Sequence, residues 1–496
     1  MTDEPELGKR VAQGVAWAGG AQAIIAVADL VSFLLVTVYW ISTKDLGIVG
    51  AVIPFYTALD YIADLGVSSA LIQHDDHTPE RVSTVFWFNL LISSGLFVLL
   101  LGLGPLYAWI QSTPVLAWLL IAYGAKLLIQ NLYAIPFALL RKELRFADVA
   151  KARIAAHLAE SISRVLYASL GASYWSFTLA AITRAFVFGL AIQLRHPWKP
   201  MFVFRPREVI SYVKFGARTA ASNVLYQVYT SLDAPIVFRF FGAEAAGIYT
   251  LADMFILEPV KTIANVVIDV AFPTFAKLRA DRRAVAAQLI KFTRINLLAV
   301  LPYTILIFLI APEILTMFWL GHGSDPKWTS HNVELCVDAI RLLCVMGFFR
   351  SLGFLGPPLL DGMGRPDLTL RYMIVAAFAV PGSFLLGAKL LGPSIGFLSV
   401  AVAWAIGYPI AFAVLAYLVA HTVKLDVREY VRSTWGIIAS CAIGLGVGFA
   451  VDRALPDASN AMRLASITAA TLGTITLLLA YWQKLTPRAI ASSLGG

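Results

Sequence analysis

Runs of about twenty apolar residues, separated by short polar segments, repeat along the whole chain of 496 residues. As a helix, a run of this length crosses the ~30 Å hydrocarbon core of a bilayer. Strands of a membrane barrel would instead alternate in polarity over ~10 residues. The pattern therefore predicts about fourteen transmembrane helices, at 14–41, 46–71, 82–104, 115–138, 152–171, 172–194, 215–241, 243–272, 292–318, 336–360, 367–391, 395–421, 433–451 and 461–482.

Lysine and arginine are abundant in every second loop between these helices and scarce in the loops between. With the N-terminus placed in the cytoplasm, the cytoplasmic segments carry 26 of the 39 basic residues and the opposite side carries 5. Basic residues concentrate in the cytoplasmic loops of membrane proteins. The asymmetry therefore supports the number of spans and predicts that both termini lie in the cytoplasm.

Composition agrees with a membrane protein and disfavours several other classes. The chain is 59% hydrophobic and 14% charged, whereas soluble domains average roughly 45–50% and 25%. Its net charge of +9 is explained by the basic loops, so we expect no nucleic acid partner. No phosphate-binding loop, zinc-protease or serine-hydrolase motif occurs, and the three cysteines lack metal-ligand spacing. We expect no catalytic residue, metal or cofactor.

The segment after the sixth predicted helix divides the chain. Arg195–Lys214 is basic, contains three prolines and has the character of a hinge. A faint repeat at an offset of 200 residues aligns Gly47-Ile48 with Gly247-Ile248. Internal repeats of this kind are typical of transporters built from two related bundles, with the substrate site near the midplane. The sequence thus predicts a transporter of two halves.

Charged and polar side chains inside the predicted helices are the candidate functional residues, because a charge at the bilayer centre costs at least ~2.5–3.5 kcal/mol. In three helices these groups share one face, as expected of helices that line an aqueous path. The stripe of the fifth helix could alternatively neutralise itself through a pair between Glu160 and Arg164. The stripes are Arg153, His157, Glu160 and Arg164 in the fifth helix, Arg218, Ser222, Tyr226, Tyr229 and Asp233 in the seventh, and Glu258, Lys261, Asn265 and Asp269 in the eighth.

Other intramembrane charges stand alone. Arg184 and Arg350 fall near the middle of their helices, where a side chain cannot easily reach the interface, so they are better candidates than Lys126. Arg218 could instead reach lipid phosphates, and Arg239 could be an interfacial anchor. Lys261 could pair with Glu258 three residues away. The remaining isolated acids are Asp29, Asp60 and Asp64.

Several stretches resemble the polysaccharide-export flippases, the Wzx/WzxC-like branch of the multidrug/oligosaccharidyl-lipid/polysaccharide (MOP) superfamily. The resemblance covers roughly the first 300 residues. Near the end of the first helix, Tyr39 stands where such proteins often have an arginine, so the anion contact of that arginine is not expected here. The stretches are ADLGVSSALIQ (Ala63–Gln73), TVFWFNLLIS (Thr84–Ser93), ALLRKELRF (Ala138–Phe146), SLDAPIVFRFFGAEAAGIYTLAD (Ser231–Asp253) and FPTFAKLRADRR (Phe272–Arg283).

The resemblance implies an all-α fold with two pseudo-symmetric six-helix lobes and two extra helices. The expected divisions are an N-lobe at 1–195, a cytoplasmic hinge linker at 196–214, a C-lobe at 215–422 and the extra helices with the tail at 423–496. It also implies that an undecaprenyl-pyrophosphate-linked oligosaccharide is passed from the inner to the outer leaflet of a bacterial inner membrane by alternating access. Membrane lipids and the polymerase and export machinery are the other expected partners.

Site residues follow from this expectation, because a pyrophosphate requires fixed positive charge inside the membrane and arginine can bind it through two donors. We expect a net positive cavity between the lobes. The candidate pyrophosphate-binding cations are Arg218, Lys261, Arg164, Arg184 and Arg350; the candidate sugar contacts are Tyr226, Gln227 and Tyr229; the candidate coupling or gating residues are Asp233, Glu258, Asp29 and Arg239.

Two other functions remain open from the residues. A small-molecule or drug antiporter of the same superfamily would have a smaller, aromatic cavity dominated by acids. A membrane polysaccharide polymerase would be favoured by a large outer loop with arginines, whereas the outer loops here are short and almost free of arginine.

Overall fold

The computed structural model describes residues 4–64, 78–143, 145–205, 207, 224–320 and 327–483. These residues form long helices with short connections, and none of them lies in a β-strand. Contacts divide the chain into two units, Met1–Arg239 and Phe240–Gly496. The prediction of an all-α membrane protein is confirmed; the finer lobe boundaries stay a prediction.

Each predicted span overlaps at least one described helix, and the tenth overlaps two. Residues 65–71 of the second span and the part of the seventh before residue 224 lie outside the described residues. Ten of the described helices are long and apolar enough to cross a bilayer. Large apolar side chains are widely exposed, including Trp109 and Phe378, each 78% exposed. Such exposure is unfavourable in water and favourable in lipid, so the chain is a multi-pass membrane protein.

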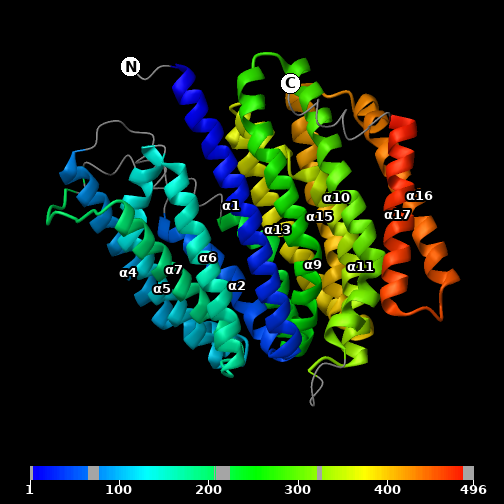
Figure 1. Cartoon of the computed structure of the whole chain (residues 1–496), viewed down its shortest axis with the longest axis horizontal. Helices are drawn as coiled ribbons and strands as arrows, with labels where there is room; N and C mark the ends of the chain where they lie inside the picture. The colour runs from blue at the N-terminus through cyan, green and yellow to red at the C-terminus, as the bar shows by residue number, and fades with distance from the viewer. Residues whose placement is uncertain are drawn as a thin grey trace. The chain divides into compact units, whose positions relative to one another are not determined.

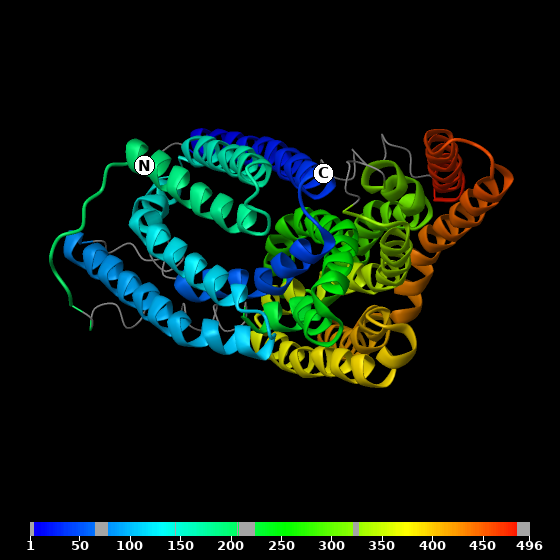
Figure 2. The same cartoon turned by 90° about the horizontal axis from the view of Figure 1, so that it is seen from below.

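The first unit is a bundle in which α6 packs against both α1 and α7, α7 packs against α5, and α5 packs against α2 and α4 (Figures 1 and 2). Thr78 caps the start of α4 by accepting a hydrogen bond from the backbone N–H of Arg81, with Pro79 in the first turn. The helices are α1 (Glu4–Tyr39), α2 (Thr43–Asp64), α4 (Pro79–Ile110), α5 (Val115–Lys142), α6 (Phe146–Ser169) and α7 (Trp175–Arg195).

The segment that follows α7 lies against α4 over its described residues. The indole N–H of Trp87 donates to the carbonyl of Met201 at 2.8 Å, and the Met201 N–H donates to Ser83 Oγ at 3.0 Å. The Arg205 N–H donates to Thr84 Oγ1 at 3.2 Å. Residues 196–205 of the predicted hinge are therefore fixed to the first unit, while 208–214 lie outside the described residues.

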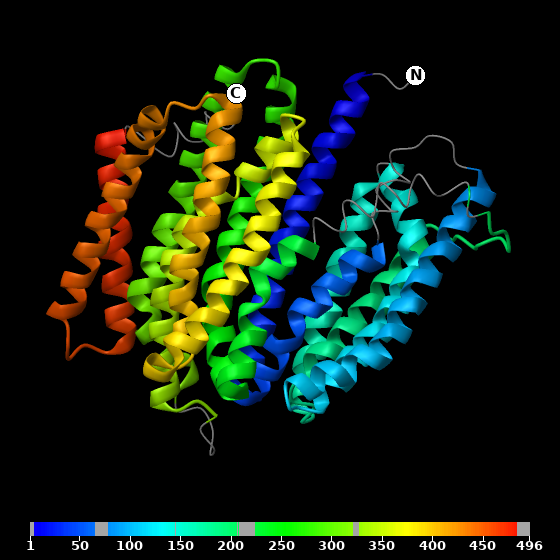
Figure 3. The same cartoon turned by 180° about the vertical axis from the view of Figure 1, so that it is seen from behind.

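In the second unit, α10 packs against α11, α16 and α17, and α15 packs against α11 and α13 (Figure 3). Arg463 of α17 joins the last two helices to α10, since it contacts Asp452 of α16 and Glu313 of α10. The helices are α9 (Asp233–Leu278), which begins in the first unit, α10 (Arg282–Trp319), α11 (Ser330–Gly353), α12 (Gly356–Gly362), α13 (Pro366–Leu390), α14 (Gly392–Ile395), α15 (Leu398–Val423), α16 (Val427–Ala454) and α17 (Asn460–Gln483).

A kink at Gly242 divides α9 where the seventh and eighth spans were predicted to meet. Gly242 has φ 85° and ψ 177°, a region of backbone conformation that is open essentially to glycine alone. The aligned repeat also lies next to a helix boundary in each copy, since Gly47 follows the start of α2 and Gly247 follows this kink.

Candidate functional site

A cavity of about 370 Å³ lies within the first unit, between α2, α4, α5, α6 and α7. Among the described residues, four basic side chains and one acidic side chain line it, so its lining is net positive. Three side-chain amides and four aromatic rings of the described residues also line the cavity. The basic residues are Lys126, Arg141, Arg153 and Arg184, the acid is Asp60, the amides are Asn89, Gln130 and Asn131, and the aromatic residues are Tyr61, Tyr133, Phe137 and Phe188.

The spacing along α5 explains why this helix contributes more of the lining than any other described helix. Lys126, Gln130, Tyr133, Phe137 and Arg141 follow one another at intervals of three or four residues, which places them on one face of a helix. The same geometry brings Arg153 and His157 together on α6, and Arg184 and Phe188 on α7. The cavity is thus formed by one face of each helix rather than by loops.

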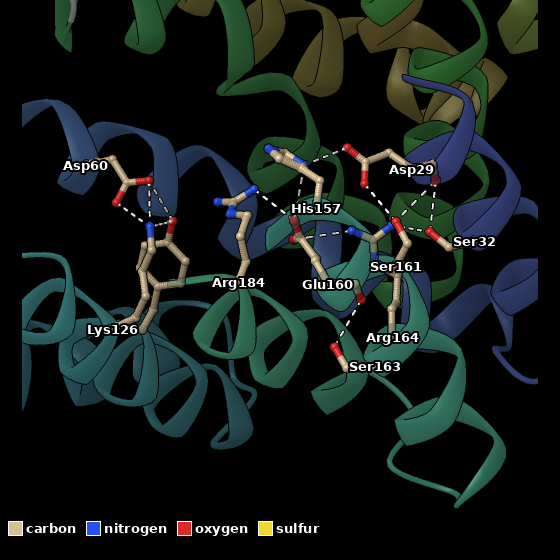
Figure 4. A network of polar contacts seen from close by, with 11 residues as sticks. Asp29, Ser32, Asp60, Lys126, His157, Glu160, Ser161, Ser163, Arg164 and Arg184 are labelled. Atoms are coloured by element: carbon tan, nitrogen blue, oxygen red, sulfur yellow. Dashed lines mark hydrogen bonds and ion pairs between the residues drawn. The ribbon is translucent and has the colours of Figure 1, made fainter. Parts of the chain in front are cut away.

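Lys126 is neutralised by an acid from another helix. Its side chain is 3% exposed, and Nζ lies 2.7 Å from Asp60 Oδ1 of α2 (Figure 4). The Tyr123 hydroxyl donates to Asp60 Oδ2 at 2.9 Å and lies 2.9 Å from Lys126 Nζ. A buried ammonium is tolerated when it is paired and hydrogen-bonded in this way.

Glu160 of α6 is the centre of a second ion-pair network (Figure 4). Its Oε1 lies 3.3 Å from Arg164 Nη2, and its Oε2 lies 3.0 Å from Arg184 Nη1 of α7. His157 Nδ1 lies 3.6 Å from Oε2. Glu160 and Arg164, which are both on α6, are buried, and the contact between Glu160 and Arg184 joins α6 to α7.

The network extends to α1 through Asp29. His157 Nδ1 lies 3.1 Å from Asp29 Oδ2, and the Ser161 hydroxyl donates to Asp29 Oδ1 at 3.0 Å. Arg164 Nη1 donates to the hydroxyl of Ser32 at 2.9 Å. The polar stripe of α6 therefore has both roles that its sequence allowed: Glu160 pairs with Arg164, while Arg153 and His157 line the cavity.

Asp29, His157 and Glu160 offer three potential metal-ligand atoms within 4.8 Å of one another. Both carboxylate oxygens of Glu160, however, already contact arginine. Two guanidinium groups beside a carboxylate oppose the approach of a further cation by Coulomb repulsion. The arrangement favours an ion-pair network over a metal centre.

Two cavity arginines differ from the others in having no carboxylate partner within 4.0 Å among the described residues. Arg141 of α5 and Arg153 of α6 both lie beside the ring of Phe137. Their guanidinium carbons are 5.6 Å and 5.8 Å from the ring centroid. Both side chains are exposed, so both can be reached by a ligand in the cavity.

Lys261 and Arg350, two further predicted cations, belong to the second unit and are not among the residues that line this cavity. Arg218 lies outside the described residues. Lys261 lies 3.5 Å from Glu258 on α9, and the two side chains are 40% and 57% exposed. Arg350 is buried in the second unit beside the rings of Phe354 and Trp404. Arg239 is exposed.

The predicted sugar contacts lie together just before α9. Tyr226 and Tyr229 meet edge to face at 5.4 Å between ring centroids, and Gln227 and Tyr229 are buried. Asp233, also buried, accepts a hydrogen bond at 2.9 Å from the backbone N–H of Ala234 through Oδ1. Their roles in sugar binding and in coupling stay predictions.

The sequence analysis ranks Lys126 below Arg184 and Arg350, although Lys126 lines this cavity and Arg350 does not. It places Arg153 in the polar stripe of α6 but not among the pyrophosphate-binding cations, and it does not name Arg141 or the amides. The signal that could have found them is the spacing of polar residues on α5. Lys126, Gln130 and Arg141 share one helical face in a largely apolar run, a pattern that marks a face turned away from lipid.

Comparison with known proteins gives matches over most of the chain. A family model described as polysaccharide biosynthesis protein matches residues 39–325. The chain is 27% identical to the teichuronic acid biosynthesis protein TuaB of Bacillus subtilis (strain 168), with 96% of each chain covered. It is 24% identical to the lipopolysaccharide biosynthesis protein WzxC of Escherichia coli (strain K12), over 86% of this chain and 85% of that protein.

Among solved structures, the fold is similar to that of lipid II flippase MurJ in an inward closed conformation. The TM-score is 0.75 at 16% sequence identity, and the match covers 95% of this chain and 99% of MurJ. This likeness extends the fold assignment to the C-terminal helices, which lie beyond the family model.

Proposed function

Because this chain belongs to the polysaccharide biosynthesis protein family, we propose that it is a flippase for an undecaprenyl-diphosphate-linked oligosaccharide. It carries this lipid from the inner to the outer leaflet by alternating access, and so serves polysaccharide export. It acts as a transporter and not as an enzyme. The flippase named in the matched structure supports this reading by analogy of fold.

The observation that carries the proposal is the basic cavity in the first unit. A diphosphate that leaves the headgroup region loses its hydration, and cationic side chains in a partly buried site replace it. Among the described residues, four such side chains and one acid line the cavity. A cavity of this sign disfavours the alternative of an antiporter for cationic drugs.

Polar groups beside the cations suit a glycan. The side-chain oxygens of Asn89 and Gln130 are buried and have no hydrogen-bond partner among the described residues. Buried amide groups are costly when unpaired, and the hydroxyls of a sugar would pair them. The cavity thus offers charge for the diphosphate and amides for the adjoining sugar.

We place the protein in a bacterial inner membrane with both termini in the cytoplasm, as the distribution of lysine and arginine indicates. The three native cysteines are buried, so a new cysteine near either terminus can be labelled selectively. A membrane-impermeant maleimide should react with it only after the membrane is opened, and reaction in intact spheroplasts would contradict this topology.

Deletion of the gene in its own bacterium distinguishes the three functions. Loss of a flippase should abolish surface polymer and leave lipid-linked repeat units in the inner leaflet, where an impermeant reagent applied to spheroplasts cannot reach them. Loss of a polymerase would leave the units accessible in the outer leaflet, and loss of a drug antiporter would not change the polymer. Re-expression of the wild-type chain is the control, and normal polymer in the deletion strain would contradict the proposal.

A further inference from the structure

The four cations of the cavity are not equivalent. Lys126 is paired with Asp60, and Arg184 is paired with Glu160. Each of these cations joins two helices and shares its charge with a carboxylate. The cavity cations that no carboxylate of the described residues contacts within 4.0 Å are Arg141 and Arg153.

The acids nearest to Arg141 and Arg153 in sequence are held by other basic residues. Glu143 lies 3.7 Å from Arg145 and 3.2 Å from His196. Asp148 lies 2.7 Å from Arg145 and 3.7 Å from Arg195. The connection between α5 and α6 thus neutralises itself and leaves the two cavity arginines without a counter-ion among the described residues.

Phe137 brings these two like charges to one place. Both guanidinium groups lie against the same ring, Arg141 from the next turn of α5 and Arg153 from α6. Cation–π attraction is worth about 0.5–1 kcal/mol at an exposed site. The two positive charges repel each other. Such an arrangement is stabilised further when an anion with more than one charge lies between the arginines.

We propose that Arg141, Phe137 and Arg153 form a diphosphate-binding subsite in the first unit. The two guanidinium groups take one phosphate each, through paired N–H donors, and Phe137 fixes their positions. The assignment of this anion to a lipid-linked glycan rests on the proposed function. In the proposed topology, the subsite lies at the cytoplasmic end of α5 and α6, where the headgroup of a lipid in the inner leaflet would meet it.

Inorganic pyrophosphate is the probe that tests the subsite without the lipid. Isothermal titration on the purified full chain in detergent should show binding that is weaker for orthophosphate, because a single phosphate cannot engage both arginines equally. Arg141→Gln and Arg153→Gln should each weaken pyrophosphate binding by about tenfold, and the double variant by about a hundredfold. The double lysine variant should keep part of the affinity, because it keeps the charges and loses the paired donors.

Lys151→Gln is the matched control. Lys151 is exposed on α6, two residues before Arg153, and does not line the cavity. This variant should bind pyrophosphate like the wild type. Gel filtration and thermal unfolding show that each variant is folded, which is expected because both arginines are exposed.

The outcomes separate this proposal from the proposed function. Absence of pyrophosphate binding by the wild type, or wild-type affinity in the double glutamine variant, overturns the subsite. Binding that depends on both arginines, in a protein that does not move the lipid-linked glycan, supports the subsite and overturns the flippase function. Transport by the wild type that the double variant retains in full overturns the subsite alone.

Discussion

Replacing Glu160 by glutamine should destabilise the protein by about 3–5 kcal/mol, the cost of removing one partner from a buried ion pair. Glutamine keeps the shape of the side chain and one acceptor oxygen, so the loss of stability measures the contribution of the negative charge. The substitution leaves Arg164, which is buried, and Arg184 facing each other across a neutral group. The two helices α6 and α7 would then be held apart by like charges instead of being joined.

The measurement is the thermal unfolding midpoint of the purified protein in detergent. Asp367→Asn is the matched control, because it makes the same change in an ion pair with Arg365 whose side chains are 51% and 49% exposed. Water already solvates that pair, so the midpoint should change little. A midpoint for Glu160→Gln equal to that of the control would show that the network does not stabilise the unit.

The second large effect concerns Lys126 and Asp60. Asp60→Asn should destabilise the protein by about 3–5 kcal/mol, because it leaves a nearly inaccessible ammonium without its carboxylate. The double variant Asp60→Asn/Lys126→Met should recover most of that loss, since replacement of both partners of a buried pair is often nearly neutral. It should also keep pyrophosphate binding, because the pair is neutral as a whole.

Thermal unfolding of the two single variants and the double variant gives the coupling free energy between these residues. Pyrophosphate titration of the double variant is the independent readout. Additive losses of stability would contradict the paired role. Loss of pyrophosphate binding in a folded double variant would show instead that Lys126 binds the anion directly.

The fold could be predicted because apolar length and loop charge act locally along the chain. Even the separation of the seventh and eighth spans at Gly242 is marked by a glycine in the sequence. The ends of the helices were harder to predict from the sequence, because hydropathy marks the part of a helix that crosses the lipid and not its full hydrogen-bonded length. Thus α10, which ends at Trp319, begins at Arg282, ten residues before the predicted start of the span at residue 292.

The cavity could be predicted only in part. The helical spacing of Arg153, His157, Glu160 and Arg164 placed a polar face on α6 correctly. The spacing could not show that Glu160 also forms an ion pair with Arg184 of α7. Nor could it show that Asp60 forms one with Lys126, 66 residues away in the sequence. Which cations are neutralised depends on helix packing, and this is why isolated central arginines were preferred over Arg141 and Arg153 near helix ends.

Transbilayer movement of the lipid itself is the direct test of the proposed flippase function. The purified chain is reconstituted into vesicles that contain a diphosphate-linked oligosaccharide with a fluorescent sugar, and an impermeant quencher reports the fraction in the outer leaflet over time. We expect vesicles with the wild-type chain to expose the inner pool of the lipid faster than protein-free vesicles, and Arg141→Gln/Arg153→Gln to lose most of this rate. Movement no faster than in protein-free vesicles, with folded protein in the membrane, would contradict it.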